Sequence, residues 1–165
     1  MKTIYLIGFM GSGKSTVGVA LANKLTKTYV DTDQFIVDTH QQEITDIFRK
    51  FGEETFRNFE TNALKKACTY EVVSTGGGIV EKSENIQIMK NSGIIIYLHA
   101  SFNEITNRLE KDESRPLWKS DDKDRLKLFE RRLSMYKKYA DHMIHTDGKN
   151  VDEIVQEIEN DIILE

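Results

Sequence analysis

The chain has 165 residues, of which 39% are hydrophobic and 30% are charged, and its formal net charge at pH 7 is −4. A domain typically holds roughly 100–200 residues, so this length predicts a single domain, and apolar residues spread along the whole chain exclude a disordered protein. The mild acidity argues against a nucleic-acid partner. No apolar run reaches the roughly 20 residues of a membrane span. The single cysteine and the lack of a signal-peptide pattern predict a cytoplasmic protein.

Short apolar runs alternate with helical patterns. The strands predicted in chain order are at 3–7, 29–30, 72–75, 94–98 and 143–146. Between and after them, helices are predicted from 14, after 33, at 44–51 and 56–67 on either side of Gly52, at 83–92, from 102, after 122 and from 150. Ser83 is expected to cap its helix, Ser101 and Glu104 match a capping box, and Asn150 opens the last helix.

This alternation of strands with helices predicts βαβ units, and therefore a parallel sheet of about five strands covered by helices on both faces. Neither an internal repeat nor a linker divides the chain. The fold class predicted is α/β in one domain, residues 1–165.

Residues 8–15 match the phosphate-binding pattern G-x-x-x-x-G-K-[ST] in full. The glycines let the backbone curl so that successive N–H groups point at phosphate oxygens, and the helix that follows adds the positive end of its dipole. Lys14 is expected to reach the β- and γ-phosphates, and the Ser15 hydroxyl to ligate Mg²⁺. The match predicts that the chain binds ATP or GTP.

Two classes of nucleotide-binding protein compete at this point, a switch GTPase and a small-molecule kinase. A GTPase needs an Asn-Lys-x-Asp guanine reader, and the run that begins at Asn23 has Thr26 in the fourth position and lies on the first helix. The charged residues outside the loop fit a kinase better.

Asp31 and Asp33 follow the second strand, at the edge where an open α/β sheet binds its ligand. Residues two apart on a strand point to the same side, so both carboxylates are expected to face the phosphate loop. One could hold the water shell of the metal and the other accept a proton from an acceptor hydroxyl. The alternative is a structural one, an Asx turn or a helix N-cap at Asp33.

Arg57 has Glu60 three residues on, which is the spacing of an ordinary surface ion pair. If the arginine instead faces a cleft, it suits a planar carboxylate, which it can hold with two parallel hydrogen bonds. Arg132 presents the same choice.

Arg115 stands beside Pro116, the only proline, in the aperiodic segment 110–122. This segment suggests a lid that carries the charge of Arg115 to the transferring phosphoryl group, or else an ordinary surface loop. The run Gly76, Gly77 and Gly78 follows a strand and would let the backbone approach a ligand closely, although a tight turn is the simpler explanation.

Taken in order and spacing, these motifs resemble the shikimate kinase family, part of the nucleoside-monophosphate-kinase-like group of phosphate-loop proteins. The resemblance runs from about residue 4 to residue 147. It rests on the following motifs: the phosphate loop, Asp31-Thr32-Asp33, Ile47-Phe48, Gly52-Glu53, Phe56-Arg57, Glu60, the triple glycine, Arg108, Ser114-Arg115-Pro116-Leu117, and Arg132 with Tyr136. The chain departs from the family at Gln41-Gln42-Glu43-Ile44, where Gly-x-Ser-Ile is frequent, and around Lys149.

The resemblance implies a role for each matched residue. The ATP phosphates would be held by Gly11, Ser12, Gly13, Lys14, Ser15 and Thr16. Mg²⁺ would be bound by Ser15 and, through water, by Asp31, while Asp33 would bind the acceptor hydroxyls and act as the base. The carboxylate and ring of the acceptor would be held by Arg57, Arg132 and the backbone of Gly76, Gly77 and Gly78. Arg115 would close over the phosphates, and Arg108 would lie near the adenine.

The resemblance also implies a monomer with strand order 2-3-1-4-5, substrate-binding helices at about 33–62, and transfer of a phosphoryl group from ATP to the 3-hydroxyl of shikimate in aromatic amino-acid biosynthesis. A sugar-acid kinase of the gluconate type is the alternative enzyme, since it shares the phosphate loop and an acceptor that bears a carboxylate. A nucleotide-dependent binding protein without an acceptor is the alternative from another class.

Overall fold

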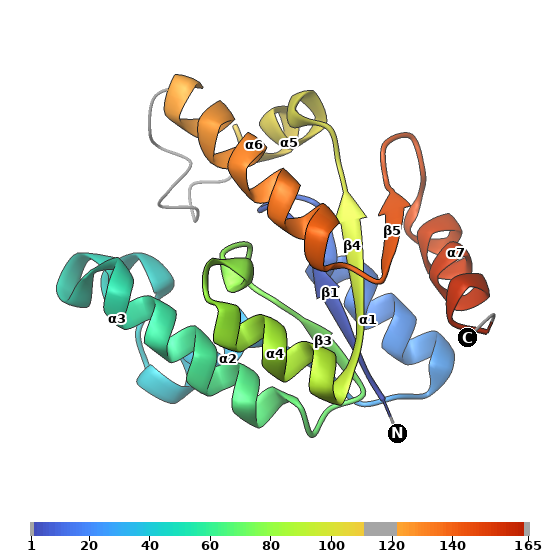
Figure 1. Ribbon diagram of the computed structural model, residues 1–165, viewed down its shortest axis with the longest axis horizontal. Coiled ribbons are helices and arrows are strands. Elements are labelled where there is room, and N and C mark those ends of the chain that lie inside the picture. Colours follow the sequence, from blue (N-terminus) through green and yellow to red (C-terminus); the bar gives the residue numbers. More distant parts are fainter. Residues whose placement is uncertain (1, 111–121, 164–165) are drawn as a thin grey trace.

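The computed structural model describes residues 2–110 and 122–163, and in it a five-stranded sheet lies between layers of helices (Figure 1). The strands are β1 (Thr3–Ile7), β2 (Tyr29–Asp31), β3 (Val72–Ser74), β4 (Gly93–His99) and β5 (His142–His145). The helices are α1 (Lys14–Leu25), α2 (Thr32–His40), α3 (Ile44–Ala67), the short 3-10 helix η1 (Ile79–Glu81), α4 (Ser83–Ser92), α5 (Phe102–Leu109), α6 (Asp122–Tyr139) and α7 (Val151–Ile163). In this described part, no helix is both long and apolar enough to cross a membrane.

The strands pair in parallel in the order β2-β3-β1-β4-β5, which confirms the expected fold class and strand order. Strand β1 is central: Ile4 is paired with Val72 on one side and with Ile94 on the other. All five residues of β1 are buried, as expected for a strand that helices cover on both faces. The loop after β1 therefore starts at the middle of the carboxyl edge of the sheet.

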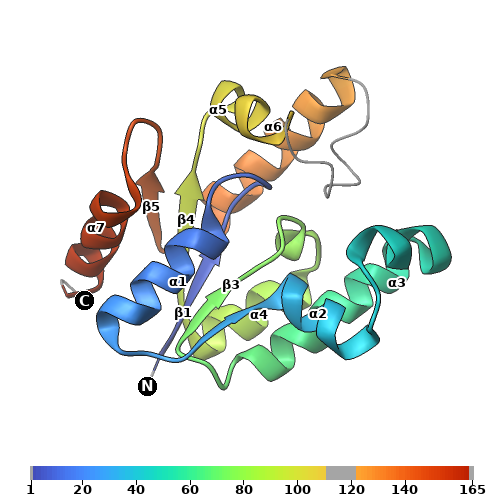
Figure 2. The ribbon, with the colours of Figure 1, turned by 180° about the vertical axis from the view of Figure 1, so that it is seen from behind.

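Alternate residues of β1 belong to two separate cores because successive side chains point to opposite faces. Tyr5 and Ile7 pack on the face covered by α4 and α6, whereas Ile4 and Leu6 pack on the face covered by α1 and α7 (Figures 1 and 2). The two cores share one sheet, which supports a single domain.

A third, smaller core joins α2 to both pieces of α3, beside the sheet. Its buried members are Ile36, Ile47, Phe56 and Ala63. At Gly52 the backbone leaves the helical conformation, with φ 82° and ψ 173°, so α3 consists of two helical pieces across a kink. The predicted break at Gly52 is confirmed, and Arg57 lies buried in the second piece.

The expected helix caps have three different outcomes. Ser83 does not cap α4, because it is already helical and no side chain caps this helix. Ser101 Oγ accepts from the Glu104 N–H at 3.3 Å as predicted, but the Ser101 N–H bonds to Asp147 Oδ1 rather than to Glu104. Asn150 forms a reciprocal pair of side-chain to backbone bonds with Glu153.

Candidate active site

The phosphate-binding loop joins β1 to α1 and has the conformation that its glycines predict. Gly11 and Gly13 have φ values of 80° and 90°, a region that residues with a Cβ rarely occupy. Lys14 is only 8% exposed, and its Nζ donates to Gly8 O at 2.8 Å and to Phe9 O at 3.0 Å. The loop thus wraps around the ammonium group, and its N–H groups and the start of α1 face one cleft.

This nucleotide cleft brings together all the described residues predicted to bind ATP. It is lined by Gly11, Ser12, Gly13, Lys14, Ser15, Thr16 and Arg108, with Thr146, Lys149, Val151 and Ile154 at the other end. Arg108 Nη1 donates to Gly11 O at 2.9 Å, so Arg108 lies against the phosphate loop. The prediction for Arg115 and the predicted lid fall on residues 111–121, outside the described part of the chain.

Asp31 contributes its two carboxylate oxygens to different neighbours. Oδ2 accepts from Ser15 Oγ at 2.5 Å, and Oδ1 accepts from the N–H groups of Asp33 and Gln34 at the start of α2. Asp31 is therefore the N-cap of α2, so the structural alternative of a helix cap is borne out at Asp31 and not at Asp33. A hydroxyl and a carboxylate side by side, next to the phosphate loop, fit the oxygen ligands and water shell that Mg²⁺ prefers.

Asp33 lies in the first turn of α2 rather than on the strand, so strand alternation is the wrong reason for pairing the two carboxylates, although Asp31 and Asp33 both line the nucleotide cleft as expected. The strand ends at Asp31, and the helix turns Asp33 toward a second, smaller cavity. Asp33, Ile44 and Gly77 line both this cavity and the nucleotide cleft. The Asp33 carboxyl consequently stands at the junction where a phosphate and a neighbouring ligand would meet.

The triple glycine makes room for the charged groups around the smaller cavity. A Cβ at Gly76 would lie 2.6 Å from Glu60 Oε2 and 2.7 Å from Asp33 Oδ1, and a Cβ at Gly78 would overlap the Arg57 guanidinium. A Cβ at Gly77 would lie 3.2 Å from Met10 N. These close approaches explain why three glycines follow β3, where a turn needs only one.

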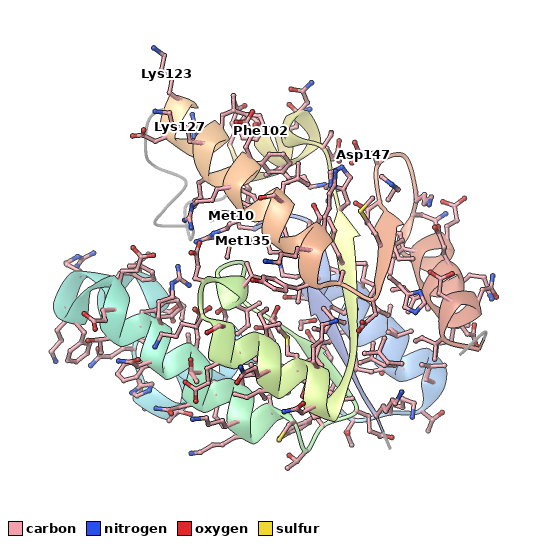
Figure 3. The ribbon with its side chains drawn as sticks, viewed as in Figure 1. Met10, Phe102, Lys123, Lys127, Met135 and Asp147 are labelled. Atoms are coloured by element: carbon pink, nitrogen blue, oxygen red, sulfur yellow. The ribbon has the colours of Figure 1, made fainter. Side chains whose placement is uncertain are left out.

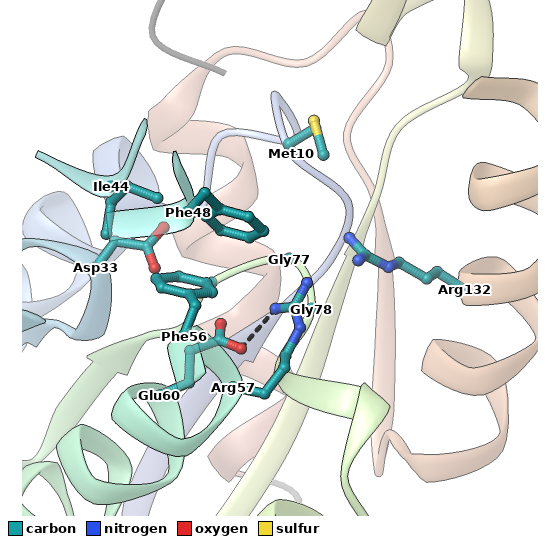
Figure 4. Close-up of a pocket in the computed structure, with 11 residues that line it drawn as sticks. Met10, Asp33, Ile44, Phe48, Phe56, Arg57, Glu60, Gly77, Gly78 and Arg132 are labelled. Carbon is teal, nitrogen blue, oxygen red and sulfur yellow. Dashed lines mark hydrogen bonds and ion pairs between the residues drawn. The ribbon is translucent and has the colours of Figure 1, made fainter. Parts of the chain in front are cut away.

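Arg57 and Glu60 form a buried ion pair, so the surface-pair alternative for Arg57 is wrong. Arg57 Nη1 lies 2.6 Å from Glu60 Oε1, and Nη2 lies 3.0 Å from Glu53 Oε1 (Figure 4). Burial acts to lower the pKa of the guanidinium, but the two carboxylates raise it above its usual value, and Arg57 stays charged. Burial raises the pKa of Glu60 to about 7 against the opposing effect of Arg57, and Asp33 adds to the rise.

Arg132 reaches the cavity from the opposite side, on α6 (Figure 4). The residue is 1% exposed, and its Nε donates to Glu81 Oε1 at 2.9 Å. Two guanidinium groups from helices far apart in the sequence therefore converge on one cavity, as the carboxylate-binding interpretation requires.

Sequence reasoning missed the apolar part of this wall, which consists of Met10, Ile44, Phe48 and Phe56. The Phe48 and Phe56 rings pack with centroids 4.6 Å apart. The cavity encloses about 430 Å³, counting the part open to solvent, and its apolar wall with a few converging charged groups suits a small molecule. A sequence offers no direct signal for such residues, because Phe48 and Phe56 also follow the ordinary pattern of a helix core.

Comparison with known proteins agrees with this geometry. The family model described as shikimate kinase matches residues 10–163. A shikimate kinase of Bacillus cereus is 42% identical over 98% of this chain and 99% of its own length, and one of Persephonella marina is 44% identical over 96% and 97%.

Solved structures agree as well. The shikimate kinase from Acinetobacter baumannii in complex with shikimate has a TM-score of 0.94 and 32% identity, covering 99% of this chain and 93% of that protein. A gluconokinase from Sinorhizobium meliloti, with a TM-score of 0.57 and 16% identity, shares the fold alone. The match over nearly the whole length, together with the phosphate loop, the buried arginine pair and the triple glycine, places this chain in the shikimate kinase family.

Proposed function

We propose that this chain transfers the γ-phosphoryl group of ATP to the 3-hydroxyl of shikimate, giving shikimate 3-phosphate and ADP for aromatic amino-acid biosynthesis. The observation that carries the proposal is the smaller cavity, where buried Arg57 and Arg132 face Asp33 and where Asp33 and Gly77 also border the nucleotide cleft. A carboxylate held by the two guanidinium groups would leave the hydroxyls of a small ring directed toward Asp33 and the phosphate loop.

The roles of the acceptor residues follow from their positions. Arg57 and Arg132 would bind the carboxylate, with the backbone of Gly77 and Gly78 close to the ring, and Phe48 and Phe56 would pack against its apolar face. Glu60 holds Arg57 in place through the 2.6 Å ion pair. Because these side chains are preorganised by burial, little conformational freedom is lost when the acceptor binds.

In the transfer step, Asp33 would accept the proton of the attacking hydroxyl while the hydroxyl oxygen forms a bond to the γ-phosphorus. The bond from that phosphorus to the oxygen bridging it to the β-phosphate breaks, and ADP leaves. Lys14, the loop N–H groups and Arg115 would neutralise the charge on the phosphoryl oxygens, so catalysis comes mostly from positioning and electrostatics. Mg²⁺, bound through Ser15 and through water to Asp31, would supply further charge neutralisation on the β- and γ-phosphates.

We also propose the oligomeric state, the class of partners and the location of the protein. A monomer is proposed because the resemblance to the shikimate kinase family implies one. Small-molecule substrates alone, without nucleic acid or membrane, fit the acidic sequence with pI ≈ 5.6. A cytoplasmic location would provide the ATP and would keep Cys68 reduced.

The direct test is a coupled ADP-release assay with shikimate and gluconate as alternative acceptors, with Mg²⁺ and ATP held constant. Turnover with shikimate and none with gluconate is expected. Turnover with gluconate alone would identify the sugar-acid kinase, and ADP release that neither acceptor stimulates would identify a nucleotide-binding protein.

A further inference from the structure

Glu81, which no motif singled out, joins the end of the glycine segment to α6. It is the last residue of η1, three residues after Gly78. Its carboxylate accepts from Arg131 Nη1 at 2.7 Å, from Arg131 Nη2 at 2.9 Å and from Arg132 Nε at 2.9 Å. One carboxylate thus binds two consecutive arginines of the same helix.

The two arginines differ in burial. The Arg131 side chain is 54% exposed, whereas that of Arg132 is 2% exposed and that of Glu81 is 18% exposed. An exposed pair contributes little, but a buried guanidinium depends strongly on the carboxylate that orients it. Burial acts to raise the pKa of Glu81, yet the hydrogen bonds from both arginines bring it below its usual range, so the carboxylate is charged near neutral pH.

The contact with Glu81 sets the direction of Arg132. Basic side chains at the start of α6, Lys123 and Lys127, point away from the molecule (Figure 3), whereas the terminal amino groups of Arg132 point toward the cavity (Figure 4). Because Glu81 accepts the Nε–H, the planar guanidinium cannot rotate about its axis without losing that bond. The Nη edge is therefore the edge presented to a ligand.

Tyr136 makes a second link between the same two segments. It lies one helical turn after Arg132, and its hydroxyl donates to Gly77 O at 2.5 Å. Burial raises the pKa of Tyr136 despite the opposing charge of Arg132, which keeps the hydroxyl protonated as a donor. Arg132 Nη1 is also 3.6 Å from where a Gly77 Cβ would be, so both links fix Arg132 relative to the glycine backbone.

We propose that Glu81 is a positioning residue for the acceptor. By accepting the Nε–H of Arg132, Glu81 orients that guanidinium so that its terminal amino groups meet the acceptor carboxylate. The hydrogen bond from Tyr136 holds Gly77 in place relative to Arg132. This inference rests on the proposed function, because it takes the smaller cavity as the acceptor site. It differs from a general tie between α6 and η1, which Arg131 would serve as well as Arg132.

The test compares Glu81→Ala and Glu81→Gln with Arg131→Ala, a matched control that removes two of the three hydrogen bonds to Glu81 but leaves Arg132 bound. Glu81→Ala should raise the KM for shikimate about 10-fold, with the KM for ATP within about twofold of wild type. Glu81→Gln keeps an oxygen for the Nε–H and should recover most of this loss, and Arg131→Ala should change either KM less than about twofold.

Two further measurements separate positioning from folding. In an Arg132→Ala background, Glu81→Ala should lower kcat/KM by less than about twofold, because a residue that acts through Arg132 has nothing left to orient. Tyr136→Phe removes only a hydroxyl, and it should raise the KM for shikimate about threefold with an unchanged KM for ATP. Thermal unfolding and calorimetric titration of shikimate, without ATP, show whether each variant is folded and binds.

The inference is overturned if folded Glu81→Ala and Tyr136→Phe both bind shikimate, and retain their KM for shikimate, as wild type does. It is equally overturned if Arg131→Ala raises the KM for shikimate as much as Glu81→Ala does. The same holds if Glu81→Ala lowers kcat/KM as much in the Arg132→Ala background as it does in the wild type. Wild-type protein that fails to phosphorylate shikimate would instead refute the proposed function, so the two failures are distinguishable.

Discussion

The Arg57 guanidinium lies 2.6 Å from the Glu60 carboxylate, and the two side chains are only 9% and 1% exposed. A buried pair of this kind is poor evidence for stability, because the two charges lose much of their hydration. Its position beside the triple glycine gives it another use, since Glu60 holds a charged arginine ready for an anionic ligand. The first predictions follow from this pair.

Arg57→Ala should lower kcat/KM for shikimate at least about 100-fold, because the acceptor carboxylate loses a charged, bidentate partner. The Kd for ATP, measured by calorimetry, should stay within about twofold. Arg49→Ala is the matched control: Arg49 lies on the same helix, and its side chain is 79% exposed in a pair with Asp46. Near-normal shikimate turnover in Arg57→Ala would contradict the carboxylate role.

Gly78→Ala should disturb the acceptor site without touching the nucleotide cleft. The added methyl group overlaps the Arg57 guanidinium, which must move. We expect kcat/KM for shikimate to fall about 10-fold or more, whereas in an Arg57→Ala background the same change should have little effect. Equal losses in both backgrounds would show that Gly78 acts through something other than Arg57.

Asp33→Asn should reduce kcat about 1,000-fold, within the range expected for loss of a general base, and leave the Kd for ATP nearly unchanged. Asp38→Asn on the same helix is the control, because Asp38 is exposed and its carboxylate accepts a bond from Gln34 on the same helix. Comparable losses in kcat and nucleotide affinity would count against Asp33 as the base.

Asp31→Asn separates the two uses of that side chain. Asparagine is as good an N-cap as aspartate, so α2 should remain capped and the melting temperature should change little. The group that faces Ser15 becomes an uncharged amide NH2 while the remaining oxygen caps α2, however, and the Mg²⁺ concentration for half-maximal activity should rise about 10-fold. A large fall in melting temperature with an unchanged Mg²⁺ requirement would assign Asp31 to the cap alone.

The pKa of Glu60 predicts a pH-dependent stability. Because burial raises this pKa to about 7, the folded protein binds the proton more tightly than the unfolded chain, whose carboxyl titrates near its ordinary pKa. This proton binding adds up to about 3 kcal/mol to the free energy of unfolding. The added stability is fully present below the ordinary pKa and is lost as the pH rises toward 7.

Urea unfolding from pH 4.5 to 8 measures this dependence, which Glu60→Gln should flatten. Glu84→Gln is the control, because Lys65 lowers the pKa of this exposed carboxyl and gives a weak dependence of opposite sign. An identical slope in wild type and Glu60→Gln would contradict the prediction.

The sequence alone was enough for most of the features that depend on neighbours along the chain, although the cap expected at Ser83 and the second bond of the capping box at Ser101 did not form. The phosphate loop, the five strands, the break at Gly52 and the opening of the last helix at Asn150 were read from spacings of a few residues, where local geometry follows the residue types. The strand order came from the family resemblance, because alternating strands and helices do not by themselves order a sheet.

Only the tertiary structure decided which polar residues share a site. Spacing could not tell a surface pair from a buried one at Arg57, because burial is set by elements distant in sequence. The cap of α2 at Asp31 rather than Asp33 is a local contact, so distance along the chain does not explain that error. The bond from Tyr136 to Gly77 spans 59 residues, and that from Arg132 to Glu81 spans 51. Contacts at such separations exist only once the sheet brings α6 over the end of β3, so no local pattern encodes them.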